Sequence, residues 1–136
     1  MGDSILAQKR ERAQRPKLFY QQGKNNMNDN KYPLNPILIV DDENQILISL
    51  SRVLSSGGMN NIICCNESKN VIELIRWKKV CIVLLDLTMP HISGKELLLK
   101  IKEDFPDTSV IIVTGINEIE TAIQCMKMGA SDYLVK

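Results

Sequence analysis

The chain has 136 residues, of which 44% are hydrophobic and 24% are charged, so it is long enough for one folded domain with a substantial core. No apolar run approaches the roughly 18 residues that span a bilayer, and the N-terminus lacks the apolar core of a secretory signal. This excludes the membrane-spanning and secreted classes, and we expect a cytoplasmic protein.

Charge divides the chain into two parts. Residues 1–35 carry seven Lys and Arg against three Asp and Glu, whereas residues 36–136 carry ten against thirteen. We therefore predict a basic extension or linker over 1–35 and a folded domain over 36–136. The basic residues are scattered rather than clustered, so direct nucleic acid binding is not expected.

From residue 36 onward, short apolar runs rich in β-branched residues alternate with longer stretches whose apolar residues repeat at helical spacing. This pattern predicts parallel strands joined by crossover helices, and therefore an α/β domain. Each run is almost entirely apolar, as in strands that are covered on both faces. The predicted strands are 37–40, 61–65, 80–85, 110–113 and 133–135.

Four helices are predicted between these strands. The first should end at Gly57 and Gly58, the second should begin at Ser68, and the third should run from about Lys95 to the residues before Pro106. The face that the first helix is expected to bury consists of Ile46, Leu50, Val53 and Leu54.

The fourth predicted helix has a possible cap at each end. Asn117 is expected to cap its start, Glu120 has the spacing of a capping-box partner, and Gly129 should end it. The stripe that it is expected to bury consists of Ile119, Ala122, Ile123 and Met126.

Polar residues directly follow four of the five predicted strands. Asp41 and Asp42 follow the first, Asp86 the third and Thr114 the fourth, while Lys136 ends the fifth. In an open parallel sheet the binding crevice lies at the carboxyl ends of the strands, where the strand order reverses. We therefore expect these five side chains to meet at one edge of the sheet.

Three carboxylates at one edge would repel one another, since two unit charges about 4 Å apart cost on the order of 4 kcal/mol at an effective dielectric near 20. Carboxylates with open coordination positions suit Mg²⁺, which favours a phosphate oxygen as a further ligand. Asp86 comes from the central strand, so it is the expected nucleophile and phosphate acceptor, with Lys136 and Thr114 as donors to the phosphoryl group.

Each of these residues also has an ordinary structural explanation. An Asp at a strand end commonly forms a turn or caps a helix, and a single Thr or Lys at such a place is common. The structural explanations would all have to coincide at one edge of one sheet, so the sequence favours a phosphoryl site.

Four segments, taken in chain order, closely resemble the receiver domain of two-component response regulators. Their sequences are similar to those of receivers attached to transcriptional activators. The segments are 37–43, 84–90 with Gly94 following, 113–115 and 129–136. The resemblance implies a flavodoxin-like, doubly wound sheet of five parallel strands in the order 2-1-3-4-5. It also implies a phosphoprotein that acts in phosphorelay signal transduction and transcription regulation.

The resemblance also implies a role for each residue of the predicted site. Asp86 would receive the phosphoryl group from a sensor histidine kinase. Asp42 would bind Mg²⁺ directly, Asp41 largely through water, and the Thr88 backbone carbonyl would complete the protein's share of the coordination.

Two further residues would act as a switch. The Thr114 hydroxyl would move toward the phosphoryl group and the Tyr133 ring would turn inward. The surface of the fourth helix and fifth strand would then change, which is also where a homodimer would form.

The chain departs from the family at its end, because members continue past the lysine equivalent to Lys136 into a fifth helix. We expect that helix and a downstream effector domain to be absent from this chain. Alternatively, residues 5–20 would cover the face that the helix leaves exposed.

Two other functions remain open. The chain could be a receiver-like interaction module that is never phosphorylated. Less favoured is a Mg²⁺-dependent phosphatase with an aspartyl-phosphate intermediate, since such enzymes place an acid two residues after the nucleophile, where this chain has Thr88. We expect no enzyme, beyond self-phosphorylation from small donors and autodephosphorylation.

Overall fold

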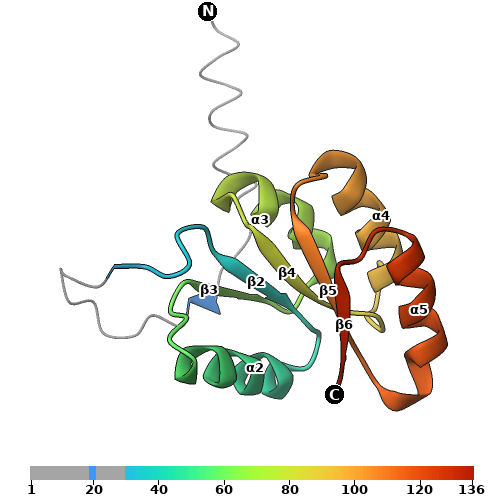
Figure 1. The fold of residues 1–136 in the computed structure, drawn as a ribbon, viewed down its shortest axis with the longest axis horizontal. Coiled ribbons are helices and arrows are strands. Elements are labelled where there is room, and N and C mark those ends of the chain that lie inside the picture. Colours follow the sequence, from blue (N-terminus) through green and yellow to red (C-terminus); the bar gives the residue numbers. More distant parts are fainter. Residues whose placement is uncertain (1–18, 21–29) are drawn as a thin grey trace, which may run out of the picture.

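The computed structural model describes residues 19–20 and 30–136, and their core is a six-stranded sheet (Figure 1). The strand order is β1-β3-β2-β4-β5-β6, and every pair is parallel except β1 with β3. The five parallel strands therefore have the predicted order 2-1-3-4-5. The strands are β1 Phe19–Tyr20, β2 Ile37–Val40, β3 Ile62–Cys65, β4 Ile82–Asp86, β5 Ser109–Thr114 and β6 Asp132–Val135.

Four α-helices connect the parallel strands, as predicted. They are α2 Asn44–Ser56, α3 Val71–Lys78, α4 Gly94–Asp104 and α5 Ile119–Lys127. Two 3₁₀ turns, η1 (Ser68–Asn70) and η2 (Ile116–Glu118), precede α3 and α5. Helices α3, α4 and α5 cover one face of the sheet, and α2 covers the other (Figure 1).

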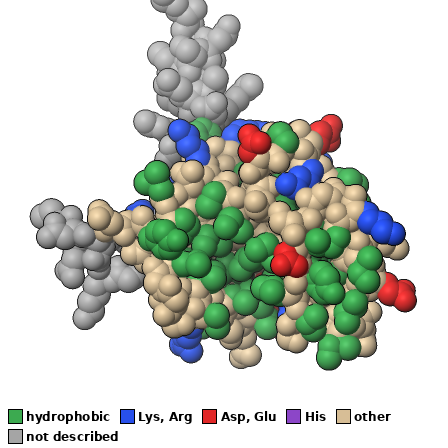
Figure 2. Space-filling view, in the orientation of Figure 1, with side chains coloured by type: hydrophobic (Ala, Val, Ile, Leu, Met, Phe, Trp, Pro, Cys, Tyr) green, Lys and Arg blue, Asp and Glu red, His purple; other side chains and the backbone are tan. Residues whose placement is uncertain are grey.

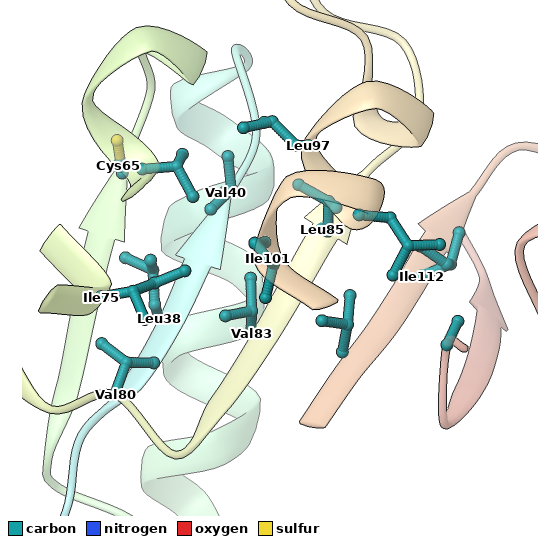
Figure 3. Packing of buried hydrophobic residues seen from close by; sticks show 14 of the residues in the cluster. Leu38, Val40, Cys65, Ile75, Val80, Val83, Leu85, Leu97, Ile101 and Ile112 are labelled. Carbon is teal, nitrogen blue, oxygen red and sulfur yellow. The ribbon is translucent and has the colours of Figure 1, made fainter. Parts of the chain in front are cut away.

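The sheet separates two hydrophobic cores, because successive strand residues point to opposite faces. On the face of α3 and α4, the close-up in Figure 3 shows Leu38, Val83 and Leu85 of the strands meeting Ile75 and Ile101 of the helices. The strand residues that alternate with these point to the other face of the sheet and form the second core, under α2. Its buried members are Ile37, Ile39, Leu47, Ile62, Cys64, Leu84 and Val113.

The second face carries exposed apolar surface near β6. Leu134 of β6 keeps 48% of its surface exposed. Ile82 and Ile111 pack against the second core but are only partly buried. Figure 2 shows hydrophobic side chains gathered on the side of the molecule that α2, β6 and α5 present.

The N-terminal segment reaches the sheet at an unexpected place. β1 pairs with β3, Phe19 with Cys64 and Tyr20 with Ile63. β3 lies at the opposite side of the parallel sheet from β6. For Phe19 and Tyr20 the predicted covering of the last strand is therefore wrong, and residues 5–18 lie outside the described part of the chain.

Some predicted helix faces are wrong in detail. Val53 is 65% exposed, and α2 buries Leu47 and Ser51 instead. In α5, Ile123 is 46% exposed, because this helix turns Ala122 and Cys125 toward the sheet. Met126 is also exposed. In both helices several apolar residues allowed more than one face, and packing against the strands decided between them.

Ser68 does not cap α3. It is the first residue of η1, and its hydroxyl donates a hydrogen bond to the Pro90 carbonyl at 3.0 Å. It also accepts a hydrogen bond from the Ile92 N–H at 3.4 Å. Ser68 therefore ties η1 to the loop between β4 and α4.

Candidate functional site

Three carboxylates meet at the carboxyl ends of β2 and β4. Asp41 directly follows β2 and Asp86 is the last residue of β4, and the register that pairs Val40 with Leu85 places them side by side. Asp41, Asp42 and Asp86 each offer one oxygen, and these oxygens lie within 4.8 Å of one another. Asp41 is 1% exposed and Asp86 is 3% exposed, so two of the charges are buried.

Each oxygen of the Asp41 carboxylate has one partner. Oδ1 accepts a hydrogen bond from the Glu43 N–H at 2.9 Å. Oδ2 lies 3.0 Å from the Lys136 ammonium, with which it forms an ion pair. Because this ammonium is shared with Asp86, it compensates the two buried carboxylates only in part, which favours a further cation beside them.

Lys136 neutralises part of this charge. Its ammonium nitrogen lies 3.1 Å from Asp86 Oδ1 and 3.0 Å from Asp41 Oδ2. Its backbone N–H donates to the Thr114 carbonyl at 2.7 Å, which continues the β5–β6 pairing. Burial lowers the pKa of Lys136, but the bonds to the two carboxylates outweigh it and the pKa is raised. The ammonium is therefore charged.

The electrostatics of Asp86 reflect its crowded surroundings. Burial, together with the charge of Asp41, raises its pKa to about 6, against the opposing effect of Lys136 and the backbone of Thr88. At neutral pH the carboxylate is mostly ionised but poorly compensated. One ammonium for three carboxylates leaves the cluster negative, which suits a divalent cation.

The two threonines at this edge share one partner, Glu118. The Thr114 hydroxyl lies 3.2 Å from Glu118 Oε2 and 3.2 Å from the Gly115 carbonyl. The Thr88 hydroxyl donates to Glu118 Oε1, and the Gly115 N–H donates to Oε2 at 3.4 Å. Thr114 and Thr88 thus flank the acidic cluster with their hydroxyls directed toward Glu118.

The match to a family model decides the classification. Residues 37–136 match the model described as the response regulator receiver domain. The chain belongs to this family. The segments that carried the resemblance all lie within the matched residues.

Curated relatives agree with this assignment. The chain is 33% identical over 103 residues to the regulatory protein AtoC of Escherichia coli, covering 76% of this chain and 22% of that protein. It is 34% identical over 100 residues to the transcriptional regulatory protein ZraR of Escherichia coli O157:H7, covering 74% of this chain and 22% of that protein. The matched part of the chain thus spans about a fifth of the length of these two regulatory proteins.

Solved structures show the same fold. A response regulator receiver domain protein from Clostridium thermocellum is 34% identical, with a TM-score of 0.69 over 75% of this chain and 82% of that chain. The receiver domain of NtrX from Brucella abortus is 29% identical, with a TM-score of 0.70 over 74% of this chain and 84% of that chain.

A glycine allows the receiver domain to bring α4 against the acidic cluster. A Cβ placed on Gly94 would lie 2.3 Å from the Asp86 carbonyl oxygen and 2.7 Å from the Leu87 Cα. The Gly94 N–H donates to the Leu87 carbonyl at 3.1 Å. Any larger residue would push α4 away from the end of β4, and with it the loop that carries Thr88.

Tyr133 lies in β6, opposite Ile112 of β5. Its ring is partly buried and packs against the core under α3, α4 and α5. It therefore lies on the same face of the sheet as α5, three residues before Lys136.

Glu118 is a residue of the site that was not predicted from the sequence. Asn117 and Glu120 were expected to cap the fourth helix, but α5 begins at Ile119 after the turn η2, and Glu118 is the residue that bonds back to the Gly115 N–H. Glu118 lies three residues after Gly115, which is the capping-box spacing. That spacing was the available signal, but it does not reveal the bonds to Thr88 and Thr114.

Among the described residues of the receiver domain, none of the helices has the length and apolar composition needed to span a membrane.

Proposed function

We propose that this receiver domain is a phosphorylation-activated switch that accepts a phosphoryl group from a sensor histidine kinase on Asp86, in a Mg²⁺-dependent reaction. The observation that carries the proposal is the meeting of the buried Asp41 and Asp86 carboxylates with one ammonium, that of Lys136. A binding module without phosphate chemistry has no need for this arrangement, because burying like charges is costly.

The transfer is a nucleophilic substitution at phosphorus. A carboxylate oxygen of Asp86 attacks the phosphorus of the donor phosphohistidine, an O–P bond forms, and the N–P bond breaks. The bonding electrons leave with the imidazole, which takes up a proton. Because the pKa of Asp86 is about 6, most of the carboxylate is ionised and ready to attack at neutral pH.

The residues present fit a magnesium ion. Asp41, Asp42 and Asp86 would hold it with the Thr88 backbone carbonyl, and the excess of three carboxylates over one ammonium supports this assignment. When bound, the ion supplies positive charge that offsets the developing charge on the phosphoryl oxygens. The Lys136 ammonium would bind a phosphoryl oxygen, and the Thr114 hydroxyl would donate a hydrogen bond to the phosphoryl group.

Phosphorylation would then shift the population between two packings of the domain. Thr114 would turn toward the phosphoryl group, and Tyr133, which is only partly buried, would turn further inward. The surface formed by α5 and β6 would change, and a homodimer through this face is the expected response. Gly115, beside which a Cβ would meet no atom within 4 Å, leaves the site accessible to water or to a phosphatase.

We propose that the chain has two parts. Residues 36–136 would form the receiver domain and residues 1–35 a basic extension. The relatives AtoC and ZraR are named as regulatory and transcriptional regulatory proteins, so an effector in transcription is the output we propose. The domain would act in the cytoplasm as a phosphoacceptor rather than as an enzyme.

The test is labelling by a small phosphodonor. Wild-type protein incubated with acetyl phosphate and Mg²⁺ should gain one phosphoryl group by intact mass, and Asp86→Asn should gain none. Asp107→Asn, an exposed Asp in the loop after α4, is the matched control and should label normally. Undiminished label on Asp86→Asn would reject Asp86 as the acceptor, and an unlabelled wild type would favour the inert interaction module.

A further inference from the structure

The Glu118 carboxylate joins two loops that flank Asp86. It accepts the Thr88 hydroxyl from the loop after β4 and lies 3.2 Å from the Thr114 hydroxyl at the end of β5. It also accepts the Gly115 N–H at 3.4 Å. The Thr88 and Glu118 positions are thirty residues apart, so this contact belongs to the tertiary structure rather than to one turn.

The Thr114 hydroxyl has one proton to donate. Its acceptors within reach are Glu118 Oε2 and the Gly115 carbonyl, both at 3.2 Å, and neither belongs to the acidic cluster. Thr114 is fully buried, so water does not offer an easy substitute. A hydroxyl that donates to a phosphoryl oxygen on Asp86 therefore has to release Glu118 first.

We propose that Glu118 is a positioning residue that holds the Thr114 and Thr88 hydroxyls in the resting state, and so opposes the turn of Thr114 toward a phosphoryl group on Asp86. This latch, the contacts of Glu118 with Thr114 and Thr88, rests on the proposed function of Asp86. A ligand that favours the released packing must break the latch, so removing Glu118 should tighten binding of that ligand.

The charge of Glu118 strengthens the argument. The Glu118 carboxylate accepts the Thr88 hydroxyl and the Gly115 N–H and lies 3.2 Å from the Thr114 hydroxyl. Hydrogen bonds to a charged acceptor are stronger than neutral ones, so the resting arrangement is favoured until the hydroxyls have a competing anion.

The position of Glu118 connects this exchange to a helix. Glu118 is the last residue of η2 and immediately precedes α5. Release of its carboxylate would free η2 from both loops at once. The latch thus links events at Asp86 to the start of α5, whose outer side carries the exposed Ile123 and Met126.

The experiment measures the affinity for beryllofluoride, a phosphoryl mimic, in the presence of Mg²⁺ by isothermal titration calorimetry. We compare the full chain with Glu118→Gln and with Glu120→Gln, which removes the same charge from an exposed position two residues along. Glu118→Gln should bind about three- to tenfold more tightly, and Glu120→Gln should bind as the wild type does. A residue with a merely structural role would instead weaken binding when replaced.

A double-mutant cycle separates the latch from a simple loss of charge. In a Thr114→Val background, the gain from Glu118→Gln should fall to within about twofold. If the gain persists unchanged there, Glu118 acts only through its charge and the latch is wrong. Thr88→Val, at an exposed position, breaks one latch contact without changing charge and should also tighten binding, which decides the matter if Thr114→Val does not fold.

The remaining outcomes are distinct. If the wild type binds beryllofluoride and Glu118→Gln binds equally or less tightly, the latch is overturned while the proposed function stands. If the wild type does not bind, or Asp86→Asn binds as well as the wild type, the proposed function is overturned and the latch falls with it.

Discussion

The Lys136 ammonium lies 3.1 Å from Asp86 Oδ1, although the two residues are fifty positions apart in the chain. The same ammonium lies 3.0 Å from Asp41 Oδ2. Lys136 thus provides one cation that pairs with both buried carboxylates.

Replacement of Lys136 should impair phosphorylation without abolishing metal binding. Lys136→Gln removes the cation that would hold a phosphoryl oxygen, so the labelling rate with acetyl phosphate should fall by at least about tenfold. The control is Lys127→Gln, which removes an exposed lysine at the end of α5 and should leave the rate unchanged. Equal rates for the two variants would contradict a role for Lys136 at the phosphoryl group.

The buried charge of Asp86 should make stability depend on pH. Its pKa rises from 3.8 to about 6 on folding, so between these values the folded protein binds more protons than the unfolded chain. The free energy of unfolding should therefore fall as the pH rises from about 4 to about 6, by on the order of 3 kcal/mol from this group. Urea unfolding at several pH values without Mg²⁺ measures this change in the free energy of unfolding.

The variant Asp86→Asn should lose that dependence. At pH 7 without Mg²⁺ it should be more stable than the wild type by about 1 to 3 kcal/mol, and near pH 4 the two should converge. Asp107→Asn, at an exposed position, should follow the wild-type curve. A less stable Asp86→Asn at pH 7 would show that the ionised carboxylate is well compensated.

Magnesium should stabilise the folded domain through the acidic cluster. At a concentration ten times its dissociation constant it should add about 1.4 kcal/mol to the free energy of unfolding. The gain should shrink at pH 5, because protons compete for Asp86, whose pKa is about 6. Asp42→Asn, which replaces an exposed carboxylate of the cluster, should reduce the gain, and Asp107→Asn should keep it.

Gly94 and Gly115 form a matched pair for the packing of α4. A Cβ on Gly94 would lie 2.3 Å from the Asp86 carbonyl oxygen, whereas a Cβ on Gly115 would meet no atom within 4 Å. Gly94→Ala should cost more than about 2 kcal/mol of unfolding free energy, and Gly115→Ala should change it by less than about 1 kcal/mol. Similar urea midpoints for both variants would show that α4 can shift at little cost.

Much of the site could be predicted from the sequence alone. Asp41, Asp86, Thr114 and Lys136 each follow or end an apolar run. In a parallel sheet with crossover helices the carboxyl ends of all strands point to one edge, so local patterns sufficed to bring these residues together. The number of strands and helices was correct because short and nearly all-apolar runs have few alternative placements, whereas the strand order came from the resemblance to receiver domains.

Tertiary structure alone decided which face of each helix is buried and which partners the hydroxyls have. Val53 and Ile123 are apolar yet exposed, because packing against the strands selects one of several apolar faces. Glu118 meets Thr88 only when the loops after β4 and β5 lie side by side. A contact between side chains thirty residues apart depends on the three-dimensional path of the backbone, and no local periodicity in the sequence records that path.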